Sequence, residues 1–192
     1  MRVFPLLILL TFASCHYYNG KLPASLPVEE TTEIVPAKLP VMTREDTPKV
    51  KETGGQKINT GNTTPAQLLT YAKSLIGTPY KYGSTDPVNG FDCSGFITHV
   101  FNHFNIAVPR SSVDFTHCKT EVPLDKALPG DLILFTGTDS TVREVGHMGI
   151  ITTANNGQVA FIHSSSGKAM GVVITPLNTY YLGRFVKVIR VF

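Results

Sequence analysis

Apolar residues recur at helical spacing in two segments that begin near residues 65 and 94. Thr64-Pro65-Ala66-Gln67 has the order of a capping box with proline at the first helical position. An apolar stripe then continues up to Gly77 and consists of Leu68, Leu69, Ala72, Leu75 and Ile76. The spacing predicts a first helix over this stretch.

The second helical pattern runs from 94 to 104, after Asp92 as a good N-cap. Its apolar residues recur three and four positions apart: Ile97, Val100, Phe101 and Phe104. A short third helix is predicted over 111–118, started by Ser111 or Ser112.

After Leu128-Pro129-Gly130 the pattern changes to short apolar runs that are typical of β-strands. We predict strands over 131–135, 147–152, 158–163, 172–175 and 184–191. Helices followed by strands favour an α+β fold, in which N-terminal helices pack on a C-terminal antiparallel sheet.

The chain begins with Met1-Arg2 and an apolar run over 3–13. This run is too short to span a bilayer and has the length of a signal-peptide core, so it predicts export. Phe12-Ala13-Ser14-Cys15 resembles a bacterial lipobox, in which the cysteine is lipidated and becomes the mature N-terminus. We therefore predict a lipoprotein-type signal peptide over 1–15, with lipid on Cys15; ordinary cleavage with an incidental Cys15 is the alternative.

Residues 19–70 contain no aromatic residue and carry repeated prolines, with lysines alternating with glutamates. Such a segment buries too little apolar surface to offset its ordering entropy. We predict a disordered tether over 16–63, with a reach on the order of 40 Å as a coil, and one folded domain over 64–192. A dispensable N-terminal segment is the other interpretation.

The chemistry-bearing residue of the second helix is Cys93, at its first position. Sulfur there faces unpaired N–H groups and the positive end of the helix dipole, which favours thiolate. The helical stripe that Cys93 shares with Ile97 and Val100 points toward the body of the domain, as a cleft floor requires. The alternative is a small buried thiol without a chemical role.

Two later histidines, His147 and His163, lie on predicted strands and complete a possible cysteine triad. Asn155-Asn156-Gly157 between them indicates a hairpin. A strict two-residue turn at Asn156-Gly157 would place the histidines on opposite faces of the sheet, whereas an odd loop would face them. We predict the odd loop, so that His163 orients His147 while His147 takes the proton of Cys93. Two ordinary strand histidines are the alternative.

The other polar candidates are weaker. Arg110 can pair with a substrate carboxylate, and a structural arginine that fixes the following turn is an equal alternative. His99 and His103 have a zinc-binding spacing but lack the glutamate of the metalloprotease pattern, so they are interpreted as boundary residues.

Charge and cysteine content exclude some classes of function. The net charge of +3 predicts no nucleic-acid partner. A bridge between Cys93 and Cys118 would consume the reactive thiol, so Cys118 is expected to pack as a small apolar residue. We predict no metal and no cofactor.

The motifs together resemble the NlpC-type bacterial cell-wall cysteine peptidases, small relatives of papain in fold. The resemblance runs from about residue 64 to 192 and covers blocks in the family's order. They are Gly77-Thr-Pro-Tyr-Lys-Tyr-Gly83, Phe91-Asp-Cys-Ser-Gly-Phe96, Val108-Pro-Arg-Ser-Ser112, Leu128-Pro-Gly-Asp-Leu132, Gly146-His-Met-Gly149 and Phe161-Ile-His-Ser164.

The resemblance implies a papain-like fold in which Cys93 is the nucleophile, His147 the general base and His163 the orienting residue. Tyr80 would line the site near the thiol, and we place Asp92, Ser94 and Arg110 with it on the substrate side. The implied reaction cleaves the bond between γ-D-glutamate and a diamino acid in peptidoglycan stem peptides. The expected protein is a monomeric lipoprotein held at a membrane through Cys15 and facing the cell wall, on the periplasmic side in a Gram-negative cell.

The chain departs from the family pattern at three places. Ser84 replaces a second glycine, the stretch 85–89 is slightly lengthened, and Phe115 stands where glutamine is frequent. These positions lie where substrate would bind, so they bear on peptide specificity. Two other functions stay open: a cell-wall binding module on an inactive scaffold, and a related cysteine amidase or acyltransferase acting on lipids or on another bacterium's wall.

Overall fold

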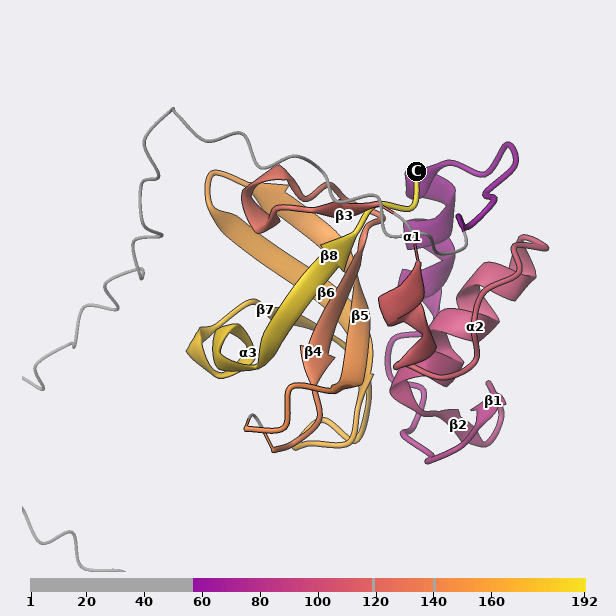
Figure 1. Ribbon diagram of the computed structural model, residues 1–192. Helices are drawn as coiled ribbons and strands as arrows, with labels where there is room; N and C mark the ends of the chain where they lie inside the picture. Colours follow the sequence, from indigo (N-terminus) through magenta and orange to yellow (C-terminus); the bar gives the residue numbers. More distant parts are fainter. Residues whose placement is uncertain (1–56, 119, 140) are drawn as a thin grey trace, which may run out of the picture. The chain divides into compact units, whose positions relative to one another are not determined.

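The computed structural model describes residues 57–118, 120–139 and 141–192 (Figure 1). The predicted signal peptide, Cys15 and most of the predicted tether lie outside the described residues. No helix among the described residues has the length and hydropathy needed to cross a bilayer.

The described chain begins with helices and continues with strands. The helices are α1 (Pro65–Ser74), α2 (Cys93–His103) and α3 (Thr179–Arg184), with 3-10 turns η1 (Asp114–His117) and η2 (Leu124–Lys126). The strands are β1 (Thr85–Asp86), β2 (Gly90–Phe91), β3 (Glu121–Val122), β4 (Leu132–Thr136), β5 (Val145–Asn155), β6 (Gln158–Ser165), β7 (Gly171–Pro176) and β8 (Phe185–Ile189).

Six of these strands form one sheet in the order β3-β8-β4-β5-β6-β7, in which every neighbouring pair is antiparallel. The β1-β2 pair forms a separate ribbon beside α2 (Figure 1). Helices that precede an antiparallel sheet confirm the predicted α+β class.

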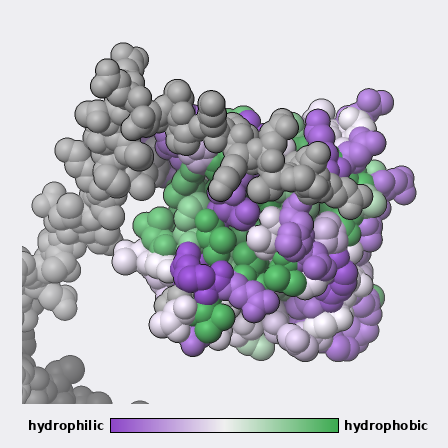
Figure 2. Space-filling model, viewed as in Figure 1, coloured by the Kyte–Doolittle hydropathy of each residue, from purple (hydrophilic) through white to green (hydrophobic). Residues whose placement is uncertain are grey.

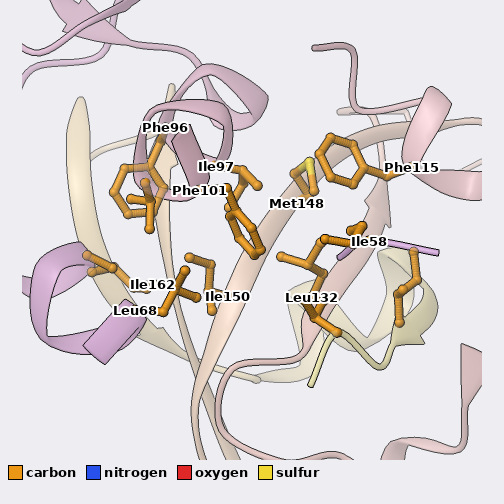
Figure 3. Packing of buried hydrophobic residues seen from close by; sticks show 14 of the residues in the cluster. Ile58, Leu68, Phe96, Ile97, Phe101, Phe115, Leu132, Met148, Ile150 and Ile162 are labelled. Atoms are coloured by element: carbon orange, nitrogen blue, oxygen red, sulfur yellow. The ribbon is translucent and has the colours of Figure 1, made fainter. Parts of the chain in front are cut away.

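The larger core lies between the sheet and the helices α1 and α2. Phe96, Ile97 and Phe101 of α2 and Met148 and Ile150 of β5 are fully buried in it (Figure 3). The apolar stripe of α2 therefore packs against one face of the sheet, which fixes the first residue of the helix relative to β5.

Two residues of this core test predictions about Cys118 and about where the folded domain begins. Cys118 is buried in the core and is not disulfide-bonded, which confirms its predicted apolar packing. Ile58, which falls in the predicted tether, is buried in the same cluster. The folded part of the chain therefore begins before Thr64, because one apolar side chain of residues 57–63 finds a place in the core.

The opposite face of the sheet carries a smaller apolar cluster, against which α3 packs. Its fully buried members include Phe135, Ile151 and Phe161, and Tyr181 of α3 covers them. Figure 2 shows apolar residues gathered toward the middle of the visible face, with polar residues around them. Both faces of the sheet are thus covered, and residues that alternate along β5 belong to different clusters.

The predicted helix starts hold where capping residues are present, whereas α1 ends at Ser74, before the predicted end at Gly77. The capping box of α1 is confirmed: the N–H of Gln67 donates to Thr64 Oγ1 and the N–H of Thr64 donates to Gln67 Oε1. The predicted third helix over 111–118 shortens to η1, which has no side-chain cap and buries only Phe115.

One helix was not predicted. Asn178 caps α3 through its side chain, which accepts from the N–H of Tyr181. Arg184 ends this helix and β8 begins at Phe185, so the predicted strand start at 184 is wrong. The local cap at Asn178 outweighs the strand pattern there.

The two helix histidines are boundary residues, as predicted. The Tyr71 hydroxyl lies 2.9 Å from Nε2 of His99, and the ring of His103 stacks on Tyr71 with centroids 3.6 Å apart. These contacts join α1 to α2 at the edge of the core.

Glycine at position 95 permits the close approach of the 84–92 loop to the first turn of α2. A Cβ there would overlap the carbonyl oxygen of Ser84 and lie 2.9 Å from Asp92 Oδ1. We expect Gly95→Ala to lower the free energy of unfolding by about 2–3 kcal/mol in urea denaturation, as overpacking does. Gly183→Ala in α3, where a Cβ meets nothing within 4 Å, is the matched control; equal stability of the two variants would contradict the prediction.

Candidate active site

The start of α2 is held by a network around Asp92. Its Oδ1 accepts from the N–H of Gly95 at 2.6 Å, which confirms the predicted N-cap. Arg110 donates to both carboxylate oxygens at 3.1 and 2.7 Å and to Ser94 Oγ at 3.0 Å. A bidentate ion pair fixes both partners, so Arg110 has a structural role at the start of α2, not at the turn that follows it, which the alternative interpretation named. Contacts of Asp92, Ser94 and Arg110 with substrate stay predictions.

Cys93 is the first residue of α2 and is partly exposed. Its Sγ lies 3.9 Å from the carbonyl oxygen of Gly146, the residue before His147 on β5. The thiol therefore lies beside the strand that carries the first candidate histidine.

The pKa of Cys93 is raised, contrary to the expected effect of the helix start. Burial raises it most and the Asp92 charge adds to this, while the backbone N–H groups of Cys93, Ser94 and Met148 act in the opposite direction. Desolvation of the sulfur outweighs the helix terminus, so the resting group is a thiol.

The hairpin between the histidines has a strict two-residue turn, so the prediction of an odd loop is wrong. Asn155 pairs with Gln158, and Asn156 and Gly157 have φ angles of 47° and 77°. Positive φ at both central positions is the geometry that Asn-Gly favours in hairpins.

A β-bulge within β5 has the effect that the odd loop was expected to have. Ile151 pairs with Phe161 but Thr153 pairs with Ala160, so Thr152 is an extra residue on one strand. Because of the bulge, the β5 residues that precede Thr152 face the opposite way from what the turn alone would give. His147 and His163 therefore lie on the same face of the sheet. Their rings meet with His147 Nε2 2.8 Å from His163 Nδ1.

Gly149 provides the room for this contact. Ile150 pairs with Ile162, so the same register places Gly149 opposite His163. A Cβ on Gly149 would lie 2.7 Å from the Phe161 ring and 3.2 Å from the Cβ of His163. The glycine of the Gly-His-Met-Gly block thus leaves space for the histidine side chains.

The second histidine continues the hydrogen-bonded row to β7. His163 is fully buried, and its Nε2 lies 2.9 Å from Thr175 Oγ1. Burial, together with the positive charge of Arg184, lowers the pKa of His163 to about 4. The pKa of His147 is lowered well below its usual range by burial, and by His163 and Arg184. Both imidazoles are neutral at pH 7.

Arg184 and Tyr181 of α3 are parts of this environment that the sequence did not indicate. Arg184 is 7% exposed and donates to Tyr180 Oη at 2.7 Å and to the carbonyl of Thr136 at 2.8 Å. The Tyr181 ring lies near all three groups: its centroid is 5.7 Å from Cζ of Arg184, 6.2 Å from the His147 ring and 5.6 Å from the His163 ring. The Asn178 cap was the signal that could have revealed the helix bearing them.

Tyr80 is joined to the segment that leads into the thiol. Its N–H donates to the carbonyl of Met170, and it forms a parallel bridge with Phe91, two residues before Cys93. Partial burial raises the pKa of Tyr80, and the charges of Cys93 and Asp92 add to the effect. Its phenol therefore lies near the thiol, and its lining of a substrate site stays a prediction.

Comparison with protein families gives a match over residues 77–190 to the NlpC/P60 family. The chain belongs to the NlpC/P60 family. The match includes Cys93, His147, His163 and Thr175, and it bears out the family resemblance found in the sequence.

Individual relatives extend this comparison. The chain is 33% identical to the "Gamma-DL-glutamyl hydrolase" of Bacillus subtilis over 70% of its own length and 32% of that protein. It is 36% identical to the "Probable endopeptidase NlpC" of Escherichia coli, over 60% of this chain and 70% of that one. The chain thus spans about a third of the first relative and most of the second.

Solved structures of NlpC/P60 domains have a similar fold. A family protein from Bacillus cereus superposes with a TM-score of 0.60 at 28% identity, over 69% of this chain and 42% of that one. The NlpC/P60 domain of the peptidoglycan hydrolase SagA gives 0.53 at 26% identity, over 67% of this chain and 99% of that domain.

Removal of the Arg184 charge should raise the pKa values of both site histidines. We expect Arg184→Met to shift the ring titrations of His147 and His163 upward in NMR, toward 6.5, with His163 starting from about 4. Because the folded-state pKa of His163 lies below its unfolded value of 6.5, the folded state is destabilised as pH falls from 6.5 toward 4, by at most about 3 kcal/mol. Arg184→Met should lose less free energy of unfolding than the wild type between pH 6.5 and pH 4.

Arg143→Met is the control for this experiment. Arg143 is exposed and donates to the backbone of Gly183 and Phe185 near α3, so its removal deletes a charge without touching the histidines. Unchanged histidine titrations in Arg184→Met would show that the guanidinium does not act on the pair.

Proposed function

We propose that this NlpC/P60 protein is a cysteine peptidase that hydrolyses the bond between γ-D-glutamate and a diamino acid in peptidoglycan stem peptides. The observation that supports it most is the 2.8 Å contact of His147 with His163. His147 lies on β5, where the carbonyl oxygen of the preceding residue, Gly146, is 3.9 Å from the sulfur of Cys93. The names of the relatives, a γ-DL-glutamyl hydrolase and an endopeptidase, point to the same chemistry.

In the proposed mechanism Cys93 and His147 act together as nucleophile and base. His163 occupies Nε2 of His147, so Nδ1 is the nitrogen left to receive a proton. As Sγ attacks the γ-glutamyl carbonyl carbon, the thiol proton passes to Nδ1 of His147, and the carbonyl oxygen becomes an oxyanion. The backbone N–H of Cys93 at the start of α2 is the proposed donor to this oxyanion.

The tetrahedral intermediate then collapses with release of the diamino acid. The C–N bond breaks, the leaving nitrogen takes the proton from His147, and a thioester joins the glutamyl group to Cys93. Water, deprotonated by His147, then attacks the thioester carbonyl carbon. The C–S bond breaks, the glutamyl group leaves as its carboxylic acid, and the sulfur of Cys93 regains its proton from His147. The raised pKa of Cys93 and the lowered pKa of His147 fit a cycle that starts from a neutral pair, with proton transfer during attack.

Turnover of a defined stem peptide tests this proposal. Full-length protein is incubated with L-Ala-γ-D-Glu-diamino acid peptides, and the products are identified by mass. We expect cleavage after γ-D-glutamate, and a loss of at least about 1,000-fold in kcat/KM in Cys93→Ala, because removing a nucleophile of this kind abolishes covalent catalysis.

Cys118→Ala is the matched control, since Cys118 is the other thiol among the described residues and is buried in the core. Equal turnover by Cys93→Ala and wild type would refute the thiol mechanism. Binding of the peptide without turnover would favour a binding module, and transfer of the glutamyl group to an added amine would favour an acyltransferase.

We also propose that the protein is an exported lipoprotein, anchored through Cys15 and facing the cell wall, and that it acts as a monomer. The apolar run 3–13 followed by Phe12-Ala13-Ser14-Cys15 supports the anchor. The proposed nucleophile, base and orienting residue lie on one chain, so the proposed chemistry needs no second copy.

Metabolic labelling with an alkyne fatty acid tests the anchor. The wild-type protein should carry the label and partition with membranes, and its mature N-terminus should be a lipid-modified Cys15 by mass spectrometry. Cys15→Ser should lose the label, whereas Cys118→Ser should keep it. An unlabelled mature protein that begins elsewhere would rule out lipidation.

A further inference from the structure

Thr175 ends a row of hydrogen bonds that crosses three adjacent strands. His147 of β5 contacts His163 of β6 at 2.8 Å, and His163 contacts Thr175 of β7 at 2.9 Å. The first contact joins Nε2 of His147 to Nδ1 of His163, and the second uses the other ring nitrogen of His163, Nε2. The row therefore links the proposed base to a hydroxyl on the edge strand of the sheet.

The proton positions along this row are coupled. A neutral imidazole carries one N–H and one acceptor nitrogen, and the hydrogen-bond partner decides which nitrogen holds the proton. Two arrangements satisfy both contacts. In one, His147 Nε2–H donates to His163 Nδ1, and His163 Nε2–H donates to Thr175. In the other, both bonds run the opposite way, and Thr175 is the donor.

Only the first arrangement leaves Nδ1 of His147 without a proton. In the second, His163 Nδ1–H donates to Nε2 of His147, so the proton of His147 must sit on Nδ1. That nitrogen then cannot accept the proton of Cys93. The direction of the Thr175 hydrogen bond therefore decides whether the proposed base is in its working tautomer.

We propose that Thr175 is a positioning residue that accepts the hydrogen bond of His163 and thereby keeps His147 in the tautomer able to deprotonate Cys93. This inference rests on the proposed function. It goes beyond the cysteine and two histidines, because it assigns a role to a hydroxyl that joins the row through His163.

The surroundings of the row support this direction. His163 is fully buried, so water does not compete for its Nε2. Thr175 is partly exposed, so its own O–H can donate to solvent while its lone pair receives the histidine. The low pKa of both histidines keeps them neutral, and only a neutral ring has a tautomer to select.

Three variants of full-length protein separate this role from simple packing. Thr175→Val keeps the size of the side chain and removes the hydroxyl; Thr175→Ser keeps the hydroxyl and removes a methyl group. Thr153→Val changes another partly buried threonine, on β5 six residues beyond His147. Turnover of the stem peptide, unfolding in urea and ¹⁵N NMR of the histidine rings are measured for each.

We expect kcat of Thr175→Val to fall about 10–100-fold with KM unchanged, the usual cost of losing a partner that orients an active residue. Its ¹⁵N shifts should show His147 losing its uniform Nε2–H tautomer. Thr175→Ser should restore kcat and tautomer, and Thr153→Val should resemble wild type in both.

Two outcomes would overturn the inference. In the first, Thr175→Val keeps the wild-type tautomer and kcat; in the second, Thr175→Ser is as slow as Thr175→Val with stability lowered in parallel, which would indicate packing alone. The NMR readout needs no substrate. If wild-type protein fails to cleave the stem peptide, the proposed function fails while the tautomer measurement still decides the role of Thr175.

Discussion

The placement of two histidines on one face of the sheet depends on a single extra residue in β5. Side chains alternate along a strand, so the tight turn at Asn156-Gly157 would by itself set His147 and His163 on opposite faces. The bulge at Thr152 reverses that alternation between the turn and His147. Without it one ring would enter the helix-side core, and the 2.8 Å contact would not form. The contact between the two histidines, and with it the proposed chemistry, therefore depends on a local irregularity in backbone pairing.

The site lies where the two layers of the fold meet. Helix α2 packs on the face of the sheet that carries Met148 and Ile150, whereas His147 belongs to the other face, beside Phe135 and Tyr181. Cys93 reaches the strand at the backbone carbonyl of Gly146. Burial then dominates the electrostatics, because it raises the pKa of the thiol and lowers the pKa values of the imidazoles. The charge of Arg184 strengthens the second effect.

The sequence predicted those features that depend on local signals. The capping box at Thr64, the Asp92 cap and the apolar stripe of α2 each follow from short-range rules, and each is present. The bulge at Thr152 could not be predicted, because nothing in Ile150-Ile151-Thr152-Thr153 marks which residue lacks a partner. The pKa direction of Cys93 was missed because it depends on burial by distant residues. Thr175 reaches His163 only through the order of strands, and Arg184 acts on the pair only through the packing of α3 on the sheet. Residue spacing reveals neither.

The raised pKa of Cys93 has a consequence for the durability of the protein. Peroxides and other oxidants attack the thiolate form of cysteine far faster than the thiol, and further oxidation to sulfinic acid is irreversible. A cysteine that stays protonated while no substrate is bound reacts slowly with oxidants. Asp92, whose charge also raises this pKa, thus helps protect the sulfur on which the proposed reaction relies.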